Sequence, residues 1–358
     1  MNKSTCEYLS LDSICTKGSS NISINKLNDC NGIYPLYGAS GFVKDIDFFH
    51  QEKPYIGIVK DGAGVGRVSI YPAKSSLVGT MQYIIPSSKC TINYLYHFLC
   101  SLNLSKFVSG ATIPHIYFKD YGKCLIPIPT IEEQGMIASE LDMITEMISK
   151  YDEQLKELDK LSQSIFYEMF GDPVENEKGW EVKIISDVST YFNGVAHEQD
   201  IDDDGEFTLI NSKFISTNGK VQKRTNKQHF PLLKNDLTMV LSDVPNGKAL
   251  AKCYLVNEDN KYSLNQRICC FRGYEGAPLF FKYVVNRHQY FLSFNDGKGQ
   301  TNLRKGDVEK MPIILPPLPL QQSFARKIEA IEAMKSKVRE AKKEAETLLA
   351  ARMQYWFE

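Results

Sequence analysis

The feature that most restricts how this chain of 358 residues can fold is an internal repeat. The stretch KDYGKCLIPIPTIEEQGMIASELDMI, which starts at Lys119, matches GDVEKMPIILPPLPLQQSFARKIEAI, which starts at Gly306, at a shift of 187 residues. In this alignment Gln134 falls on Gln321. Such a match predicts that the same structural framework occurs twice along the chain.

Each repeat continues into a long heptad pattern. Apolar residues recur at steps of four and three over about four heptads, which predicts two helices of about 40 residues, each about 60 Å long. The second helix keeps the frame but has polar residues at several seam positions. The expected seam is Ile137, Leu141, Ile144, Ile148, Tyr151, Leu155, Leu158, Ser162, Ile165 and Met169 in the first helix, and Phe324, Ile328, Ile331, Lys335, Val338, Lys342, Ala345, Leu349, Arg352 and Trp356 in the second.

The two helices differ in charge. Residues 130–171 carry 3 Lys or Arg and 10 Asp or Glu, whereas residues 317–358 carry 8 and 6. Because these flanking charges are complementary, the helices are predicted to pack together as an intramolecular antiparallel coiled coil. Periodicity alone leaves one alternative, in which two separate surface helices each pack on their own domain.

The segments before the two helices share one sequence pattern. Short β-branched and aromatic runs such as YIGIV and FTLINSKFIS alternate with Gly, Asn, Asp and Pro, and one aromatic-rich helix is expected in each segment, at 92–104 and 278–292. The first long helix is predicted to end at Gly171, before Pro173. The predicted fold class is α+β with a pseudo-twofold repeat, in which mixed α/β domains at residues 1–129 and 172–316 are joined by the long helices at 130–171 and 317–358.

Composition narrows the class of protein. The chain has no apolar run of about eighteen residues and no apolar segment near its start, so neither a membrane span nor a signal peptide is expected. Nine cysteines without C-x-x-C spacing fit a reducing, cytoplasmic environment better than a disulfide framework. The net charge of −1 argues against a uniformly basic coat, so any nucleic-acid-binding face is expected to be local.

The glycine-rich stretch KDGAGVGRVSIYPA, residues 60–73, matches a phosphate-binding loop only in part. The pattern G-x-G-x-x-G fails at Arg67, and no G-K-[ST] follows. The residues after it alternate and stop at Pro72, so a strand follows where a phosphate site needs a helix. The stretch is therefore predicted to be a tight hairpin.

Motifs for catalysis are incomplete. LPPL at residues 315–318 lacks both the amide and the aromatic residue of the adenine methyltransferase motif [ND]-P-P-[YF]. Asp172, Glu181 and Lys183 can be aligned with a nuclease pattern, but they follow a helix in a turn and such spacing arises by chance. No catalytic residue is therefore expected.

Motifs for metal binding are incomplete as well. Asp200, Asp202 and Asp204 fit the start of a calcium loop, but Asn211 stands where a bidentate Glu is needed. The six histidines have no zinc spacing and are expected at the surface or at an interface. Neither a metal nor a cofactor is expected.

The proline-rich strand, IPIPTIEEQ or ILPPLPLQQ, followed by a long heptad helix and present twice, resembles the specificity subunit of type I restriction-modification systems. Further matching pieces are YPLYGASG and VKDGAGVGRV in the first half, and LKNDLTMVLSD and YSLNQRICCFRG in the second. The resemblance covers essentially the whole chain. It implies that each α/β domain is a target recognition domain that reads one half of a split site in double-stranded DNA.

The resemblance also implies protein partners. The helices would act as a spacer between the half-sites and bind two methyltransferase (modification) subunits, which a translocating restriction subunit joins. The chain itself would be non-catalytic. The second half departs from the family pattern at Pro319 and Leu320, where the first half has Glu132 and Glu133, which leaves open the residues that hold the partner there.

Residues suited to DNA contact lie on the predicted turns. Backbone amides and basic groups suit phosphates, and amide, hydroxyl and imidazole groups suit base edges. The candidates for phosphate contact are Gly38, Ser40, Gly41, Lys60, Arg67, Lys213, Lys223, Arg224, Lys248 and Arg304. The candidates for base contact are Thr112, His115, Asn246, Gln300 and Asn302.

Two other classes of function stay open at this point. One is a cytosolic scaffold, in which the coiled coil joins two protein-binding domains. The other is an enzyme with an unrecognised site. Neighbouring genes for a methyltransferase and a helicase-nuclease would favour DNA recognition over both.

Overall fold

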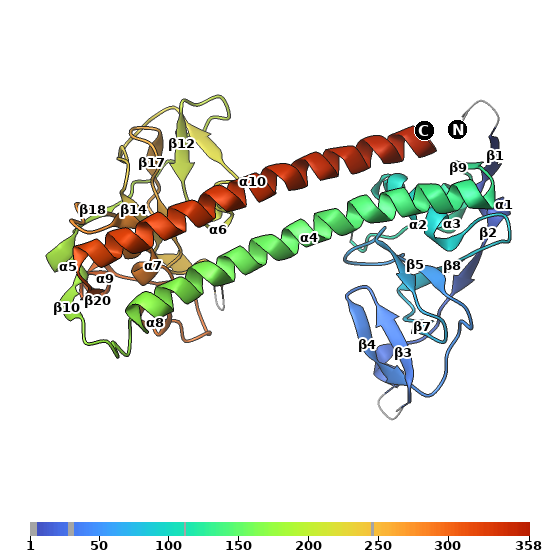
Figure 1. Cartoon of the computed structure of the whole chain (residues 1–358), viewed down its shortest axis with the longest axis horizontal. Helices are drawn as coiled ribbons and strands as arrows, with labels where there is room; N and C mark the ends of the chain where they lie inside the picture. The colour runs from blue at the N-terminus through green and yellow to red at the C-terminus, as the bar shows by residue number, and fades with distance from the viewer. Residues whose placement is uncertain (1–5, 28–31, 111, 245–246) are drawn as a thin grey trace. The chain divides into compact units, whose positions relative to one another are not determined.

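The computed structural model describes residues 6–27, 32–110, 112–244 and 247–358. Its contacts divide the chain into two compact units (Figure 1). Unit 1 consists of Met1–Gln154 and Val338–Glu358, and unit 2 consists of Leu155–Lys337. Each unit therefore holds one strand-rich part, called its globule below, and a section of both long helices.

The globule of unit 1 is built on two sheets. A four-stranded antiparallel sheet has the order β2-β8-β5-β6, and a three-stranded sheet has the order β4-β3-β7. A separate antiparallel pair, β1 with β9, joins the start of the globule to the strand that precedes the first long helix. The strands are β1 (Glu7–Ser10), β2 (Cys15–Ser19), β3 (Tyr34–Gly38), β4 (Gly41–Ile46), β5 (Tyr55–Val59), β6 (Val68–Tyr71), β7 (Ser76–Leu77), β8 (Met81–Pro86) and β9 (Leu125–Ile128). The short helices are α1 (Leu11–Ile14), η2 (Ile24–Lys26), α2 (Ile92–Ser101), η3 (Leu104–Phe107) and α3 (Phe118–Tyr121).

The globule of unit 2 repeats this topology. Its sheets have the orders β11-β18-β14-β16 and β13-β12-β17, and β10 pairs with β20 as β1 does with β9. The parallel strand pair β3 with β7 recurs as β12 with β17. The duplicated framework is thus confirmed strand by strand. The strands are β10 (Glu181–Ile184), β11 (Thr190–Asn193), β12 (Phe207–Ile210), β13 (Lys223–Thr225), β14 (Leu237–Val240), β15 (Ser242–Asp243), β16 (Cys253–Leu255), β17 (Tyr262–Leu264), β18 (Ile268–Arg272), β19 (Thr301–Asn302) and β20 (Pro312–Leu315), and the short helices are α5 (Ile185–Val188), α6 (Ser212–Ser216), α7 (Pro278–Val285), α8 (Gln289–Leu292) and α9 (Lys305–Glu309).

The central strand β5 shows why these sequences form a core. All five of its residues are buried, because β6 and β8 flank it and side chains cover both of its faces. Ile56 and Ile58 point to one face and share a core cluster with Tyr94 and Phe98 of α2. Tyr55 points to the other face and belongs to a second cluster. This alternation fixes the helix on one side of the sheet.

The two long helices are α4 (Ile131–Phe170) and α10 (Leu318–Phe357). A capping box begins α4, because Thr130 Oγ1 accepts from the Glu133 N–H at 3.3 Å and Glu133 Oε2 accepts from the Thr130 N–H at 3.1 Å. The helix ends as predicted at Gly171, whose φ of 74° is favourable only for a residue without a side chain. The indole N–H of Trp180 donates to the last carbonyl, that of Phe170, at 2.8 Å.

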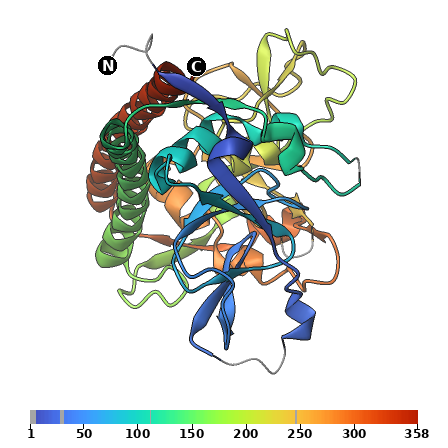
Figure 2. The same ribbon diagram turned by 90° about the vertical axis from the view of Figure 1, so that its right-hand side faces the viewer.

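In unit 1 the beginning of α4 packs against the end of α10, and Figure 2 shows the two helices side by side. The Arg352 guanidinium donates to both carboxylate oxygens of Glu140, and Lys342 Nζ lies 2.6 Å from Asp152 Oδ1. Along α4 the residue numbers of these contacts rise from 140 to 152, while those of their partners on α10 fall from 352 to 342. The helices are therefore antiparallel.

In unit 2 the end of α4 packs against the beginning of α10. The Phe324 ring contacts the rings of Phe166 and Phe170 at centroid distances of 5.7 and 5.4 Å. Lys335 Nζ lies 2.5 Å from Asp159 Oδ1. These contacts again run in opposite directions along the two helices.

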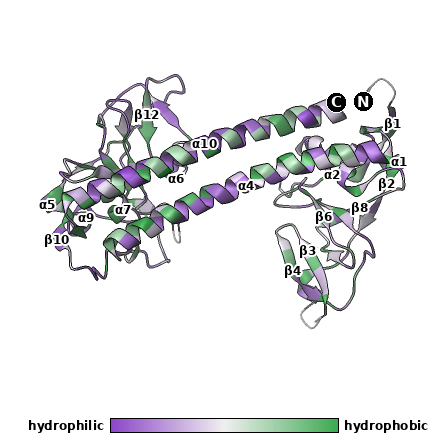
Figure 3. Cartoon of the chain, viewed as in Figure 1, coloured by the Kyte–Doolittle hydropathy of each residue, from purple (hydrophilic) through white to green (hydrophobic). Residues whose placement is uncertain are grey.

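Every residue of the predicted seam is buried or half-buried. Both helices alternate hydrophilic and hydrophobic residues along their length (Figure 3), as amphipathic helices do. The prediction of an antiparallel helix pair is confirmed, and the alternative of two separate surface helices is wrong.

Three predicted elements differ from the structure. The helix expected at 92–104 ends at Ser101, and Asn103 has a φ of 45°. The single helix expected at 278–292 is interrupted, since Asn286 is extended and Arg287 has a φ of 54°. Both residues instead bind the start of β16 and the residues just before it, because the Arg287 N–H donates to Ala251 O at 2.8 Å and Asn286 Oδ1 accepts from Cys253 N at 2.9 Å. The strand run FTLINSKFIS turns into helix α6 at its midpoint, where Asn211 Oδ1 accepts from Phe214 N at 2.9 Å and acts as an N-cap.

The six histidines were expected at the surface or at an interface, but three of them are buried within the chain. His97, His197 and His288 are only 1%, 1% and 6% exposed. Each imidazole has a polar partner that the sequence pattern does not reveal, which for His97 is Asp142 Oδ1 at 2.7 Å from Nε2. Burial lowers the pKa of all three, so they are neutral at pH 7.

Candidate nucleic-acid interface

The loop between β5 and β6 is the predicted hairpin, and its glycines shape it. Gly62, Gly64 and Gly66 have φ values of 82°, 85° and 86°, in a region that other residues rarely adopt. Arg67 at the end of the loop donates from Nη1 to Ala39 O at 2.8 Å. This bond joins the loop to the β3–β4 turn. Four candidates therefore lie close together in unit 1, namely Gly38, Ser40, Gly41 and Arg67.

A third segment, described at residues 109–110 and 112–116, joins the same region. The Ile116 N–H donates to Lys60 O at 2.9 Å, and the Gly62 N–H donates to Pro114 O at 2.9 Å. Asp61 and His115 form an isolated antiparallel bridge, which places His115 beside Lys60. Thr112 is exposed on the same segment. All seven candidates of unit 1 thus lie on three connected loops.

In unit 2 the equivalent place is the two-stranded pair β15–β19. Asn302 pairs with Ser242 there, at the position that His115 has opposite Asp61 in unit 1. Gln300 Nε2 lies 3.3 Å from Asn302 Oδ1, and both side chains are exposed. Asn246, another candidate, lies outside the described residues.

Asp243 organises the loop that follows β15. Its carboxylate accepts from the backbone N–H groups of Val244, Ala249 and Leu250 at 2.9, 2.6 and 3.2 Å. A side chain at Gly247 would collide with this carboxylate. Val244, Ala249 and Leu250 are therefore held close to one carboxylate, and Lys248 beside Ala249 has an exposed side chain.

The other basic candidates of unit 2 lie elsewhere. Lys213 is on α6 and Lys223 is on the edge strand β13, and both are exposed. Arg224 is already engaged, since Nε and Nη2 donate to the carbonyls of Gly205 and Glu206 at 2.5 and 3.0 Å. Arg304 precedes α9 with an exposed side chain. Arg304 follows β19 by two residues, beside Leu303, whose N–H donates to Leu241 O at 2.8 Å, whereas Lys213, Lys223 and Arg224 are on other elements.

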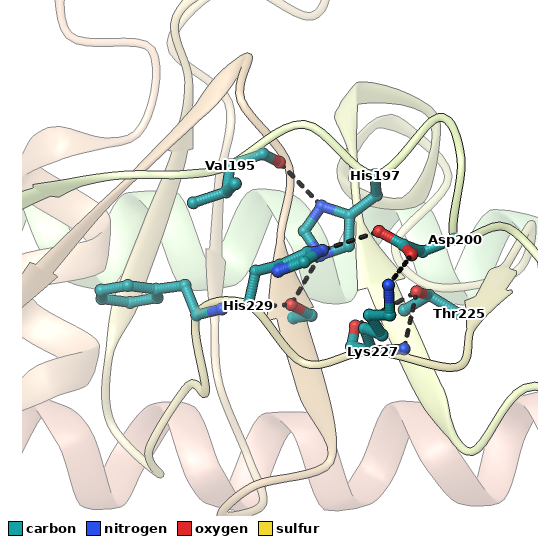
Figure 4. A network of polar contacts seen from close by, with 8 residues as sticks. Val195, His197, Asp200, Thr225, Lys227 and His229 are labelled. Carbon is teal, nitrogen blue, oxygen red and sulfur yellow. Dashed lines mark hydrogen bonds and ion pairs between the residues drawn. The ribbon is translucent and has the colours of Figure 1, made fainter.

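A buried polar network holds the end of the β13-β12-β17 sheet (Figure 4). His197 Nδ1 donates to Val195 O at 2.7 Å, because a carbonyl can only accept. Its other ring nitrogen, Nε2, therefore accepts from Ser263 Oγ at 2.8 Å. Ser263 is 0% exposed, so this Ser–His pair cannot reach a substrate and is structural.

The acidic loop that follows His197 is held by the protein's own groups. Asp200 binds His229 Nε2 at 2.7 Å and Lys227 Nζ at 2.9 Å, and these hydrogen bonds lower its pKa. Asp202 accepts from the Asp204 N–H at 2.9 Å and from Asn226 at 2.7 Å. Two of the carboxylates considered for calcium thus already have cationic or N–H partners.

A family model for the type I restriction modification DNA specificity domain matches residues 3–159 and 177–346. The chain belongs to this family. Specificity subunits recognise DNA for a restriction-modification complex and are not themselves enzymes. The family assembles with methyltransferase and restriction subunits and binds DNA.

Two curated relatives carry the same description. The specificity subunit of the type I restriction enzyme MjaIX from Methanocaldococcus jannaschii is 24% identical over 294 residues, which cover 73% of this chain and 67% of that protein. A putative type I specificity subunit from Haemophilus influenzae is 26% identical over 123 residues, or 34% of this chain and 32% of that one.

Solved structures share the fold of this specificity chain. The S subunit of a type I system from M. genitalium has a TM-score of 0.60 at 12% identity, and the match covers 99% of this chain and 96% of that chain. A chain from a study of the assembly and conformational transition of the type I R-M system has a TM-score of 0.57 at 14% identity, with 98% and 96% covered.

Sequence reasoning missed several residues that shape this specificity chain. Asp243 is one, although an Asp followed within a few residues by Asn-Gly is a signal for a side-chain-capped turn. Gln134 and Gln321 were aligned by the repeat, but the partners of their Oε1 atoms lie more than 40 residues away and left no local signal. Within the described residues, no helix is both long and apolar enough to cross a membrane.

Proposed function

We propose that each globule reads one half of a bipartite target in double-stranded DNA, and that the long helices set the distance between the halves. One observation carries this proposal. The two globules have the same strand order, while the loops at equivalent places have different sequences, such as KDGAGVGR after β5 and SDVPNGKA after β14. A common framework with different loops suits two readers with different base preferences.

The loops supply the groups that each type of DNA contact needs. In unit 1 Ser40, Gly41, Lys60 and Arg67 are proposed to contact phosphates, whereas Gly38 is buried at the end of β3 and is the weakest of these candidates. Thr112 and His115 beside them are proposed to reach base edges. In unit 2 the same roles fall to Lys213, Lys223, Arg224, Lys248 and Arg304 for phosphates and to Gln300 and Asn302 for bases.

The long helices are proposed to bind two methyltransferase subunits, with a restriction subunit joining the complex. Support comes from apolar side chains that the helix pair leaves uncovered. Met136, Met143 and Met147 of α4 are 61%, 61% and 44% exposed, and Met334 and Leu348 of α10 are 53% and 49% exposed. Flexible Met side chains suit a protein interface.

A domain exchange tests the division of readout. Residues 172–316 are replaced by the matching segment of a relative, the chain is co-expressed with its methyltransferase, and methylated sites are mapped. One half-site should change and the other should stay. If both halves change together, or neither does, the two-reader model is wrong and the coiled-coil scaffold becomes the better description.

Leu155→Pro tests the role of the helices. Proline in the interior of α4 removes a backbone hydrogen bond and costs about 3 kcal/mol or more, so assembly with the methyltransferase should be lost. Leu155→Ala keeps the backbone bond and serves as the milder control. Assembly is measured by size-exclusion chromatography of the co-expressed subunits, and an intact complex with Leu155→Pro would contradict this role.

A further inference from the structure

Two buried glutamines occupy equivalent places in the repeat. Gln134 lies in the first turn of α4 and Gln321 in the first turn of α10, and their side chains are 0% and 4% exposed. A buried primary amide is costly unless its carbonyl and its two N–H groups all find partners. Their hydrogen bonds therefore show what each helix is attached to.

In unit 1, Gln134 joins α4 to the start of α2. Its Oε1 accepts from the backbone N–H of Thr91, the N-cap of α2, at 2.8 Å. Its Nε2 donates to two backbone carbonyls, those of Lys89 at 2.9 Å and Pro129 at 3.0 Å. One side chain thus binds both the loop before α2 and the residue that leads into α4.

In unit 2, Gln321 makes the same connection to α7. Its Oε1 accepts from the backbone N–H of Ala277, the N-cap of α7, at 3.1 Å, and from the Tyr274 hydroxyl at 3.0 Å. Its Nε2 donates to Pro316 O at 2.8 Å. Gly276 permits this approach, because an added Cβ there would collide with Gln321 Oε1 and with the Tyr274 ring.

The helix that each glutamine binds is also the helix that packs on the globule's main sheet. In unit 1, α2 shares a core cluster with residues of β5 and β8, among them Ile56 and Ile84. The strand β5 leads directly into the loop that carries Lys60 and Arg67. The glutamine therefore connects the long helix, through one short rigid helix, to the sheet whose loops face the proposed target.

We propose that Gln134 and Gln321 are positioning residues that fix the angle between each globule and its long helix, and so restrict the number of base pairs allowed between the two half-sites. The inference rests on the proposed function, in which each globule reads one half-site. Only Gln provides an acceptor and two donors on one planar group of this length. Glu would lose the donors to the carbonyls. Ala would leave three backbone groups unpaired at Gln134 and two at Gln321.

The test uses the full chain co-expressed with its methyltransferase. The DNA is a plasmid library in which the two half-sites are separated by every spacer length around the preferred one. With Gln134→Ala or Gln321→Ala, methylation at spacers one base pair too long or too short should rise about tenfold relative to the preferred spacer, the effect of one or two lost hydrogen bonds. The base preference within each half-site should not change.

Two further variants make the result specific. Gln322→Ala removes the same side chain from the neighbouring exposed position and should leave spacer preference unchanged. Gly276→Ala keeps the glutamine but pushes its Oε1 away, and should relax spacer preference as Gln321→Ala does.

The outcomes separate this inference from the proposed function. Uniformly reduced methylation at all spacers, with discrimination intact, would show that the glutamines stabilise the fold without setting spacing, and would overturn the inference. Equal relaxation by Gln322→Ala would do the same. If the unmodified complex methylates without any preference for two half-sites, the proposed function itself is wrong.

Discussion

Unit 1 and unit 2 share one framework but attach the short helix to the long helices by different chemistry. Six residues after its N-cap, α2 has His97, which binds Asp142 of α4, and Asn93 of α2 binds the same carboxylate at 3.3 Å. At the equivalent position α7 has Tyr283, whose ring packs on Phe166 and Phe324 at 6.0 and 5.0 Å. In both units a glutamine of the long helix binds the N-cap of the short helix. The second contact between these helices differs, because it is a His–Asp pair in unit 1 and a cluster of aromatic rings in unit 2. The backbone framework therefore tolerates a polar or an aromatic attachment.

The largest expected effect comes from the aromatic attachment. Phe170 is fully buried between Phe280 and Phe324, and Phe170→Ala should destabilise unit 2 by about 3–5 kcal/mol because it leaves a large cavity. Phe357→Ala is the matched change in unit 1, where the ring packs on Tyr94 and Phe98. Its cost should be smaller, since the last turn of a helix can shift.

Urea unfolding can separate the two units, because each holds one of the two tryptophans, Trp356 in unit 1 and Trp180 in unit 2. Fluorescence of the two single-tryptophan variants then reports each unit by itself. Tyr167→Ala, at an exposed neighbouring position, is the control and should change little. Equal costs for Phe170→Ala and Tyr167→Ala would show that the aromatic cluster does not hold α7.

His115 and Asn302, the two positions proposed to read bases, are equivalent in the repeat. If both read bases, His115→Ala and Asn302→Ala should each cost about 1–3 kcal/mol at one base position, in opposite half-sites. Methylation mapping with each variant provides the measurement, and the untouched half-site is its internal control. Loss of preference in the same half-site for both variants would break the proposed equivalence.

The units should also differ in sensitivity to acid. Burial lowers the pKa of His97 in unit 1 and of both His197 and His288 in unit 2 from the ordinary value of 6.5. The unfolded chain therefore binds protons that the folded chain resists, so this stability is present above pH 6.5 and is lost as the pH falls below it. With two such histidines, unit 2 should lose more stability than unit 1 between about pH 7.5 and about pH 5.5.

The same single-tryptophan chains measure this acid effect. His197→Gln should flatten the pH dependence of the Trp180 signal and leave that of Trp356 unchanged. His50→Gln alters an exposed histidine and is the control. A pH dependence that is the same with and without His197 would contradict the assignment to this buried ring.

The smallest expected effect is on salt dependence. Lys223 is exposed on β13, and Lys223→Ala should weaken binding to all DNA sequences alike and reduce the slope of log affinity against log salt by about one unit. Lys156→Ala removes an exposed charge from α4 in the same unit and should leave the slope unchanged. A change in base preference with Lys223→Ala would mean that the lysine reads sequence and does not simply contact phosphate.

The long helices were the most predictable part of the fold. Heptad spacing identified seam residues such as Leu141 and Ile328 correctly, because a helical face repeats every few residues and needs no distant partner. The break after α7 could not be found in this way. It depends on Asn286 and Arg287 binding a segment more than 30 residues earlier, and tertiary bonds of this kind override local helix propensity.

The candidate interface was predictable to a smaller extent. The turn around Gly62 was found because its three closely spaced glycines are visible in the sequence, and the structure shows that all three have a positive φ. Arg224 was chosen for its charge alone, and the structure shows its guanidinium bound to two backbone carbonyls. The buried histidines were misplaced for a similar reason. A side chain's type does not show whether a neighbour from another strand will satisfy it.

Unit 1 is built from two separate segments of the chain, so it cannot be completed until the end of synthesis on the ribosome. Phe357 completes a core in which it contacts Tyr94 and Phe98, two rings that are made about 260 residues earlier. At roughly 5–20 residues per second, the nascent unit waits on the order of 15 to 50 s for its last piece. During that time all of unit 2 is synthesised. The apolar surface that Phe357 later covers remains exposed and can contact other chains. Slower translation of the last third of the message should therefore lower the soluble yield of this protein more than slower translation of the first third.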